Sequence, residues 1–262
     1  MDISRLNVDQ DLFFGETIDK ILILSFREKP LLHITDLSVK KALFDYLDIV
    51  ACCDEIKVIL IKESPTKMRH AEYIAFYKNM FRPGFDQTPL ERMLNAINQF
   101  ILKLMDLNKM IIHADSGNVI LLFMNISLAC DYRIVAENTV YQNPNIELGL
   151  APKGGSVFFL SKMLGPVMAS RILLSEEDVT AVQAHQLGIV DKVAPLEDLD
   201  RMALEVAQNY ARLPSGYSIG IKKLLNFDIK ELSQYLEFEN ELLRRMIMSG
   251  HLHNFSRLNE KL

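Results

Sequence analysis

Strand-like and helix-like runs alternate through the first half of the chain, and this alternation restricts the possible folds more than any other feature. Residues 21–26 (ILILSF) and 58–61 are continuous apolar runs of strand length, and residues 38–50 between them carry apolar residues at helical spacing. An amphipathic helix is predicted over residues 90–105, followed by a further apolar run at 110–112. Such alternation is typical of β-α-β units, so the sequence predicts an α/β fold.

The sequence changes character after residue 131, where short strands and turns are expected. Glycine and proline crowd into this region at Pro144, Gly149, Pro152, Gly154 and Gly155. Helices are predicted over residues 156–164 and 167–174, and a strand introduced by glycine is predicted over 187–193. The last third is helical, with one apolar face built by the first helix and another by the second. These faces comprise Leu199, Met202, Ala203, Val206, Ala207 and Tyr210, and then Leu232, Tyr235, Leu236, Leu242, Leu243, Met246 and Ile247. The pattern alone leaves open whether the second face packs on the chain's own core or forms a subunit interface.

Composition excludes several classes of function. The 262 residues are 49% hydrophobic and 24% charged, which is enough apolar material for a large core. The net charge is −5 and the basic residues are scattered, so nucleic-acid binding is not expected. No apolar run reaches the ~18 residues that span a bilayer, and Met1 to Gln10 lacks the basic-then-apolar order of a signal peptide. We therefore expect a cytoplasmic protein that binds neither nucleic acid nor membrane.

The three cysteines predict neither a disulfide framework nor a metal site. Cys52 and Cys53 are adjacent, Cys130 stands alone, and no CxxC pair occurs. We expect buried or incidental thiols, because free cysteine commonly behaves as a small core residue.

Four spaced motifs follow one another in the second half of the chain. Residues 128–138 read LACDYRIVAEN, and ten residues after Asp131 begins YQNPNIELGLAPKGG at residues 141–155. Residues 181–188 have the form A-x-x-A-x-x-x-G and lead into IVDKV. Residues 211–214 (ARLP) and 221–225 (IKKLL) complete the set.

Together these motifs resemble the enoyl-CoA hydratase/isomerase family of the crotonase superfamily, over roughly residues 15 to 250. The second motif is one residue shorter than the family pattern between its last proline and its glycine pair. The resemblance implies a crotonase (ClpP-like) spiral of β-β-α units in residues 1–195 and a helical trimerisation region in residues 196–262. It also implies a homotrimer or hexamer, an acyl-CoA thioester as ligand, and no cofactor or metal beyond the coenzyme A of the substrate.

The family's chemistry passes through a thioester enolate, which two backbone N–H groups stabilise. The resemblance assigns the first donor to Arg69 in the loop MRHAEY at residues 68–73, with His70 in place of the usual glycine and Glu72 in place of the usual aspartate. It assigns the second donor to Leu122. Leu122 and Phe123 are bulky where the family has small residues, so they either narrow the thioester site or are simply core residues.

Hydration in this family also needs two carboxylates that hold a water molecule and move protons. The motif spacing places these positions at Asn125 and Asn145. An amide does not accept a proton in a useful pH range, although it donates and accepts hydrogen bonds. The sequence therefore predicts that hydration by the paired-carboxylate route is lost.

Other polar side chains are candidate substitutes for the missing acids. Glu147 would face the same side as Asn145 if that segment were extended, and His70 in the oxyanion loop could orient a carboxylate. Each has an alternative interpretation, Glu147 as a surface or ion-paired residue and His70 as an exposed residue at a helix start. Asp115 and Ser116 are equally well explained as turn formers, and His113 as a hydrogen-bonded core histidine.

Substrate contacts are predicted around the same loop. Lys67, Arg69 and Lys78 could bind the phosphates of coenzyme A, with solvated surface charge as the alternative. Met68, Phe123 and Tyr141 are predicted to contact the substrate.

The leading hypothesis is a family member that acts on or binds an acyl-CoA-type thioester through an oxyanion hole and is not a standard hydratase. A lyase or isomerase reaction is favoured, with isomerisation, decarboxylation and thioester hydrolysis all open, and the carrier could be coenzyme A or a carrier protein. The alternative is a catalytically silent, thioester-binding or structural paralogue in a homo-oligomer or a mixed oligomer.

Overall fold

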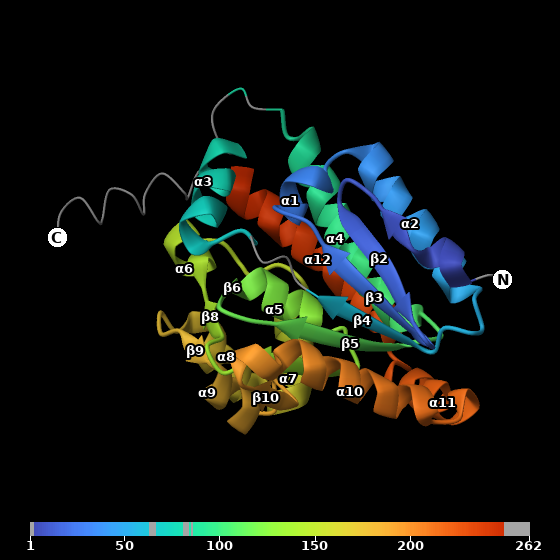
Figure 1. The fold of residues 1–262 in the computed structure, drawn as a ribbon. Helices are drawn as coiled ribbons and strands as arrows, with labels where there is room; N and C mark the ends of the chain where they lie inside the picture. The colour runs from blue at the N-terminus through green and yellow to red at the C-terminus, as the bar shows by residue number, and fades with distance from the viewer. Residues whose placement is uncertain (1–2, 63–66, 81–83, 85, 249–262) are drawn as a thin grey trace.

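Two β-sheets organise the chain, which in this computed structural model is described over residues 3–62, 67–80, 84 and 86–248 (Figure 1). The larger sheet has the spatial order β1 (Val8–Asp9), β2 (Phe13–Ile18), β3 (Ile21–Phe26), β4 (Val58–Lys62), β5 (Met110–Asp115), β7 (Tyr132–Ala136) and β10 (Lys192–Ala194). The smaller sheet has the order β6 (Asn118–Ile120), β8 (Val140–Gln142) and β9 (Val179–Thr180).

The pairing of the larger sheet follows the predicted alternation. From β3 to β10 all neighbouring strands are parallel, with Val58 of β4 opposite Met110 of β5. Parallel neighbours require crossover connections, and helical segments supply them between β3 and β4 and between β4 and β5. The β-α-β prediction is thereby confirmed. The sequence patterns did not predict β2, which pairs antiparallel with β3.

Helices make up most of the remaining described chain. They are α1 (Pro30–His33), α2 (Leu37–Ala51), α3 (His70–Met80), α4 (Thr88–Asp106), α5 (Leu121–Ser127), α6 (Pro144–Leu148), α7 (Ser156–Leu164), α8 (Pro166–Leu174), α9 (Ala181–Gln186), α10 (Leu199–Arg212), α11 (Ser215–Leu225) and α12 (Ile229–Met248), with 3-10 turns at Ile3–Leu6 and Leu196–Asp198. In the ranges that the structure describes, no helix combines the length and the apolar character needed to cross a membrane.

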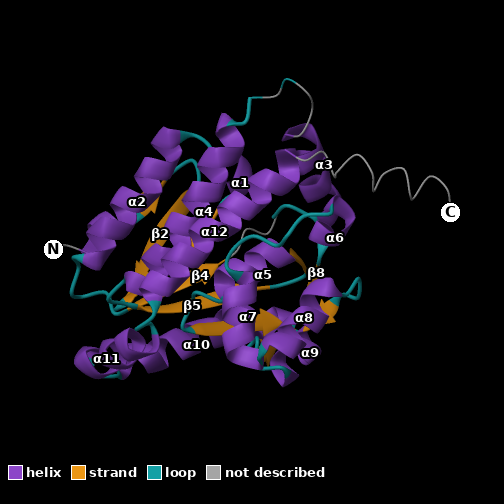
Figure 2. Ribbon diagram, turned by 180° about the vertical axis from the view of Figure 1, so that it is seen from behind, coloured by secondary structure: helices purple, strands orange, loops and turns teal. Residues whose placement is uncertain are grey.

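The larger sheet is covered on both faces. Helix α10 packs along β3, β4, β5 and β7 on one face, and α2, α4 and α12 lie on the other (Figures 1 and 2). Side chains along β4 divide accordingly: Val58 and Leu60 share a core cluster with α10, whereas Ile59 and Ile61 belong to the opposite cluster. Because successive strand residues point to opposite faces, a strand buried on both sides is apolar at every position. This explains the unbroken apolar runs of the sequence.

The apolar face of α12 packs mainly on the chain's own core. Leu232, Leu236 and Leu243 are at most 2% exposed and belong to the main cluster, and α12 lies along α4. Leu242 and Phe238 remain exposed. The core interpretation of this face therefore holds for its buried residues.

Residues of the recognised motifs tie distant elements together. The Asp131 carboxylate accepts hydrogen bonds from the Ile111 N–H at 2.7 Å and from Lys222 Nζ at 2.9 Å. Arg133 donates to the carbonyl of Ile189 and pairs with Asp191 at 3.0 Å. These motif residues therefore hold α11 and the segment before β10 against the sheet.

A buried carboxylate joins α12 to the loop that carries the glycine pair. Glu239 is 3% exposed and accepts hydrogen bonds from the Gly154 N–H and the Gly155 N–H, both at 2.9 Å, and from Lys153 Nζ at 2.8 Å. Gly154 has φ +99°, and a Cβ there would lie 3.1 Å from Cβ of Asn125, so glycine fits both the backbone and the space. We call Lys153, Gly154, Gly155 and Glu239 the Glu239 clasp.

The predicted strand over residues 187–193 is wrong in extent, since β10 comprises only Lys192–Ala194. The chain turns after α9 at Gly188, which has φ +79°. The N–H groups of Ile189 and Val190 then donate back to the Ala184 carbonyl, at 2.9 and 3.2 Å. Ile189 and Val190 are buried in the core without strand pairing, and this burial explains their apolar character.

The clasp generates a stability prediction. Glu239→Gln leaves the cation of Lys153 buried without its charge partner, and we expect unfolding free energy to fall by about 3–5 kcal/mol in urea titrations. The double variant Glu239→Gln/Lys153→Met should recover part of this loss. The control Glu241→Gln, which removes an exposed pair with Arg245, should change stability little. Equal losses in the two single variants would contradict the role of the clasp.

Candidate functional site

Three helices that follow strands carry the predicted site residues. Helix α3 follows β4, α5 begins directly after β6, and α6 begins shortly after β8. Helices α3 and α6 pack on each other, and α5 contacts both β6 and β8. The chain thus brings the loop before α3 and the starts of α5 and α6 to one region of the molecule (Figure 1).

Asn125 of α5 is fully buried and hydrogen-bonds to the loop of the Glu239 clasp. Its Nδ2 donates to the Lys153 carbonyl at 2.8 Å. A carboxylate has no proton to donate at neutral pH, so an acid at this position would face that carbonyl unfavourably. The amide therefore suits the local structure.

Asn145 of α6 is 3% exposed and uses both sides of its amide, whereas Oδ1 of Asn125 is buried without a hydrogen-bond partner among the described residues. Its Oδ1 accepts from the Tyr73 hydroxyl, and its Nδ2 donates to Asn143 Oδ1, both at 3.3 Å. An ionised acid could accept from Tyr73 but could not donate to Asn143. The two asparagines at the expected acid positions are thus members of internal hydrogen-bond networks.

Sequence reasoning missed Tyr73 and Tyr77, which are 1% and 2% exposed on α3. Their ring centroids lie 4.7 Å apart, as expected for residues one helical turn apart. Burial raises the pKa of Tyr77 to about 12, and burial together with Tyr77 raises the pKa of Tyr73 well above its ordinary value. The charge of Glu239 raises both pKa values further. The i, i+3, i+4 spacing of Tyr73, Phe76 and Tyr77 was the available signal.

Lys153 and Glu239 were missed as well. Lys153 is 1% exposed and hydrogen-bonds Asn98 Oδ1 in addition to Glu239. Burial lowers the pKa of the Lys153 amine, while Glu239 opposes that shift. No local pattern marks Glu239 as buried, because it lies on a helix rich in exposed charges.

The predicted oxyanion donors differ in their surroundings. The Arg69 N–H donates to Glu72 Oε2 at 3.0 Å, so a side chain of the same loop engages this donor. Leu122 is 1% exposed in the first turn of α5, where backbone N–H groups have no intrahelical acceptor. The oxyanion role of both residues stays a prediction.

His70 and Glu147 are brought together by the packing of α3 on α6. His70 Nε2 lies 3.5 Å from Glu147 Oε2, and Lys78 Nζ lies 3.5 Å from Glu147 Oε1. Both members of the His70–Glu147 pair are roughly half exposed. The expectation of an extended segment at Glu147 is wrong, because Pro144 starts helix α6 there and turns Glu147 away from the buried side of Asn145.

Lys67 is engaged inside the protein. Its Nζ pairs with Asp115 and donates to the Ser116 carbonyl at 2.6 Å, and both charged side chains are at most 9% exposed. Asp115 Oδ1 also accepts from the Ser116 N–H at 2.7 Å, which fits the turn-former interpretation. This geometry argues against a contact of Lys67 with coenzyme A phosphates. Arg69 and Lys78 are exposed.

The remaining predicted contact residues are buried. Met68 is 2% exposed, Tyr141 of β8 is 4% exposed, and burial raises the pKa of the Tyr141 phenol. Their contact with a substrate stays a prediction, as does that of Phe123. His113 of β5 is 5% exposed, in agreement with the core interpretation.

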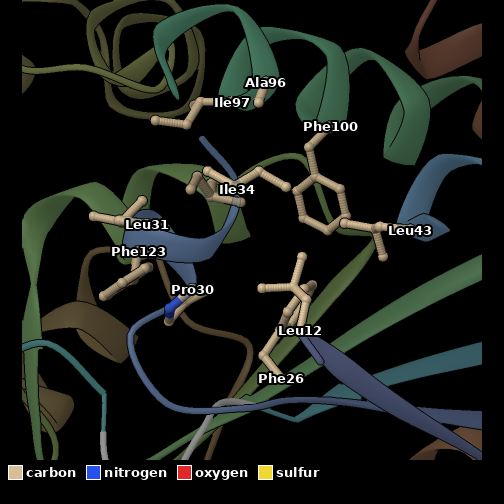
Figure 3. A pocket seen from close by; sticks show the side chains of 11 residues that line it. Leu12, Phe26, Pro30, Leu31, Ile34, Leu43, Ala96, Ile97, Phe100 and Phe123 are labelled. Atoms are coloured by element: carbon tan, nitrogen blue, oxygen red, sulfur yellow. The ribbon is translucent and has the colours of Figure 1, made fainter. Parts of the chain in front are cut away.

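Phe123 forms one wall of an apolar cavity of about 60 Å³ (Figure 3). The other walls come from the β2–β3 region, α1, α2 and α4, and the lining residues are Leu12, Phe26, Pro30, Leu31, Ile34, Leu43, Ala96, Ile97, Phe100 and Ile126. A small cavity with an apolar lining accepts hydrocarbon in preference to water. Since Phe123 directly follows Leu122 in the sequence, the cavity lies close to this predicted oxyanion donor.

A larger groove of about 580 Å³ opens beside Asn145, on the side away from Tyr73. Helices α6, α7 and α8 form it, with Met246 of α12 at one border. Its lining is mainly apolar, and Asn145 is one of its few polar members. Asn145 thus lies between the tyrosines of α3 and this groove.

Comparison with known proteins defines the class. The family model for enoyl-CoA hydratase/isomerase matches residues 77–258, and the chain belongs to this family. The crystal structure of an enoyl-CoA hydratase from Bacillus halodurans superposes with a TM-score of 0.79 at 18% identity, covering 94% of this chain and 98% of that one. A putative enoyl-CoA hydratase from Streptomyces avermitilis gives a TM-score of 0.72 at 19% identity, covering 98% and 92%. The predicted crotonase fold is confirmed.

Individual relatives match over shorter stretches. The chain is 34% identical to the 2,3-dehydroadipyl-CoA hydratase of Escherichia coli over 44% of this chain and 45% of the relative. It is 28% identical to a trans-2-decenoyl-[acyl-carrier-protein] isomerase of Streptococcus mutans over 63% of each chain. The chain thus spans about half the length of the curated relatives it matches.

The buried tyrosines predict a pH dependence of stability. Free tyrosine loses its proton near pH 10, whereas folded Tyr77 keeps it up to about pH 12. The folded state therefore binds more protons in this window, so unfolding free energy is unaffected below pH 10 and falls as the pH rises towards 12. Tyr77→Phe should reduce this slope by about 1.4 kcal/mol per pH unit in urea titrations. The exposed control Tyr217→Phe should leave the slope unchanged, and an unchanged slope in Tyr77→Phe would refute the assignment.

Proposed function

We propose that this protein binds an acyl-CoA-type thioester and moves a proton at its α-carbon without adding water. The proposal rests on the use of both amides in the structure. Asn125 and Asn145 replace the expected acids and are held by Lys153, Tyr73 and Asn143. Neither side chain can take a proton from water, so the hydration step has no base at these positions.

The acid–base group that we assign is His70. It lies at the start of α3, beside the predicted donor Arg69, with Glu147 Oε2 at 3.5 Å from its ring. Glu147 acts as a positioning residue beside the imidazole. Histidine suits this role because its ordinary pKa lies near neutral pH.

The proposed step is a proton transfer that forms an enolate. The imidazole takes a proton from the α-carbon, and the electron pair of the broken C–H bond moves to the thioester oxygen. The Leu122 N–H, in the unpaired first turn of α5, donates to that oxygen. In a thioester with a β,γ-double bond the enolate is conjugated with that bond, so return of the proton to the γ-carbon moves the double bond to the α,β-position and gives isomerisation. The name of the Streptococcus mutans relative, an isomerase, supports this reaction class.

The apolar cavity behind Phe123 supports an acyl ligand with a short apolar end. Its lining contains ten further apolar residues and no charged side chain. Phe123→Ala should enlarge this cavity and shift binding towards longer acyl chains, as measured by calorimetric titration with acyl-CoA thioesters of increasing length. The control Phe238→Ala removes an exposed phenylalanine of α12 and should leave the preference unchanged. The same chain-length preference in Phe123→Ala and the parent would contradict this assignment.

Exchange of α-protons tests the proposed reaction. With butyryl-CoA in D₂O, the parent should incorporate deuterium at the α-carbon, observed by NMR, and His70→Gln should lose about 100-fold or more of this rate. Glu147→Gln should lose less, and the control His33→Gln, at an exposed residue of α1, should exchange like the parent. Full exchange in His70→Gln would show that His70 is not the base.

A hydration assay tests the negative half of the proposal. Crotonyl-CoA should gain no water above the rate in buffer, because neither amide activates water. A robust hydratase rate would overturn the interpretation of Asn125 and Asn145.

A second candidate function is thioester binding without chemistry. The observation that favours it is the hydrogen bond from the Arg69 N–H to Glu72, which occupies one predicted donor. Calorimetric binding of butyryl-CoA without any α-proton exchange would support this candidate. Absence of binding would reject both.

A further inference from the structure

A further cavity, of about 410 Å³, lies at the end of the larger sheet away from the candidate site. Lys57 directly precedes β4 and Lys109 directly precedes β5, so the cavity lies where these parallel strands begin. Helix α11 borders it and packs on β5, at the end of the sheet away from α3 and α6 (Figure 1).

Three lysines and one aspartate line this cavity. Lys57, Lys109 and Lys223 contribute to the lining, and Asp54 is its single carboxylate. Lys57 Nζ donates to the Leu213 carbonyl at 3.5 Å. The remaining titratable group of the lining is the phenol of Tyr210. The cavity therefore carries an excess of positive charge.

Lys109 is the most telling of these residues because it is only 4% exposed. Its Nζ donates to the Cys53 carbonyl at 2.7 Å, which leaves its charge without a carboxylate partner in the part of the chain that the structure describes. Burial lowers the pKa of the Lys109 amine, and Asp54 opposes that shift. A buried cation that is hydrogen-bonded to a neutral carbonyl is still costly, and an anion in the adjacent cavity would offset part of that cost.

The first turn of α11 completes an anion-binding arrangement. The helix begins at Ser215 after Pro214, and it has neither a side-chain cap nor an acidic residue in its first turn. Ser215, Gly216 and Ser218 all line the cavity. The N–H groups of a first helical turn have no intrahelical partners, and the helix dipole favours negative charge there.

We propose that this cavity binds a compact phosphate-type oxyanion between Lys109, Lys223 and the first turn of α11. Lysines supply the opposing charge, and the backbone N–H groups of Ser215 and Gly216 supply directed hydrogen bonds. The cavity lies where strands β4 and β5 begin, whereas His70 and Glu147 lie on helices that follow the ends of strands. The proposed phosphate site therefore does not depend on the proposed function.

Calorimetric titration of the full chain with inorganic phosphate, at constant ionic strength set with chloride, tests the proposal. Saturable binding is expected, and Lys223→Gln should weaken it about tenfold, as expected for one charge-assisted hydrogen bond. Lys109→Met should weaken it at least as much. The control Lys230→Gln removes an exposed lysine of α12 outside this cavity and should bind like the parent.

A matched pair at Gly216 keeps the test independent of folding. A Cβ at Gly216 would meet no atom within 4 Å, so Gly216→Ala and Gly216→Asp should both fold, as judged by circular dichroism. Gly216→Ala should retain phosphate binding. Gly216→Asp should abolish it, because its carboxylate occupies the helix start.

Two phosphate sources can be separated in the same experiment. Titration with adenosine 3′,5′-bisphosphate asks whether a nucleotide phosphate is accepted, and equal or tighter binding than inorganic phosphate would point to a nucleotide ligand. Binding of inorganic phosphate alone would point to a free ion. Absence of saturable binding by either, or equal losses in Lys223→Gln and Lys230→Gln, would overturn the proposal.

Discussion

The contact of Glu239 with the glycine pair is the constraint on which the candidate site depends. One carboxylate from α12 accepts two backbone N–H groups and the Lys153 ammonium, all in a buried setting. Such a charge is stable only when nearly all its hydrogen-bonding capacity is used, so loop and helix hold each other in one arrangement. The same loop presents the Lys153 carbonyl to Asn125. The last helix of the chain thus determines the surroundings of a residue on α5.

Amides at positions 125 and 145 follow from these surroundings. Each asparagine donates to one oxygen of the protein, and Asn145 also accepts from a buried tyrosine. An ionised carboxylate could satisfy only the accepting half of these contacts. The side chains of Asn125 and Asn145 are therefore part of the internal hydrogen-bond network. In the proposed function His70 is the acid–base group and Glu147 positions it, and both side chains are partly exposed to solvent.

The family fold is retained by contacts of a different kind. Asp131 binds Lys222 and the start of β5, and Arg133 binds the segment before β10, so these motif residues secure the sheet and its helices. Such contacts stabilise the fold, whatever reaction the residues at the carboxyl ends of the strands carry out. The fold superposes with a TM-score of 0.79 on an enoyl-CoA hydratase at 18% identity. The lysine-lined cavity lies where strands β4 and β5 begin, so the proposed phosphate site is separate from the candidate site at the carboxyl ends of the strands.

The sequence by itself determined the α/β alternation and the main helices, and it placed asparagines where the family resemblance predicts acids. These features are local, since strand and helix periodicity depends on a few consecutive residues. Helix α7 (Ser156–Leu164), for example, has the bounds that the sequence predicts. Tertiary structure alone decided the partners: Lys67 with Asp115, Tyr73 with Asn145, and Glu239 with Gly155 are 48, 72 and 84 residues apart. It also decided that Pro144 starts a helix, which separates Glu147 from Asn145. A residue's charge or hydroxyl is visible in the sequence, but burial and packing choose what it meets, because contacts between distant residues form only when the chain folds.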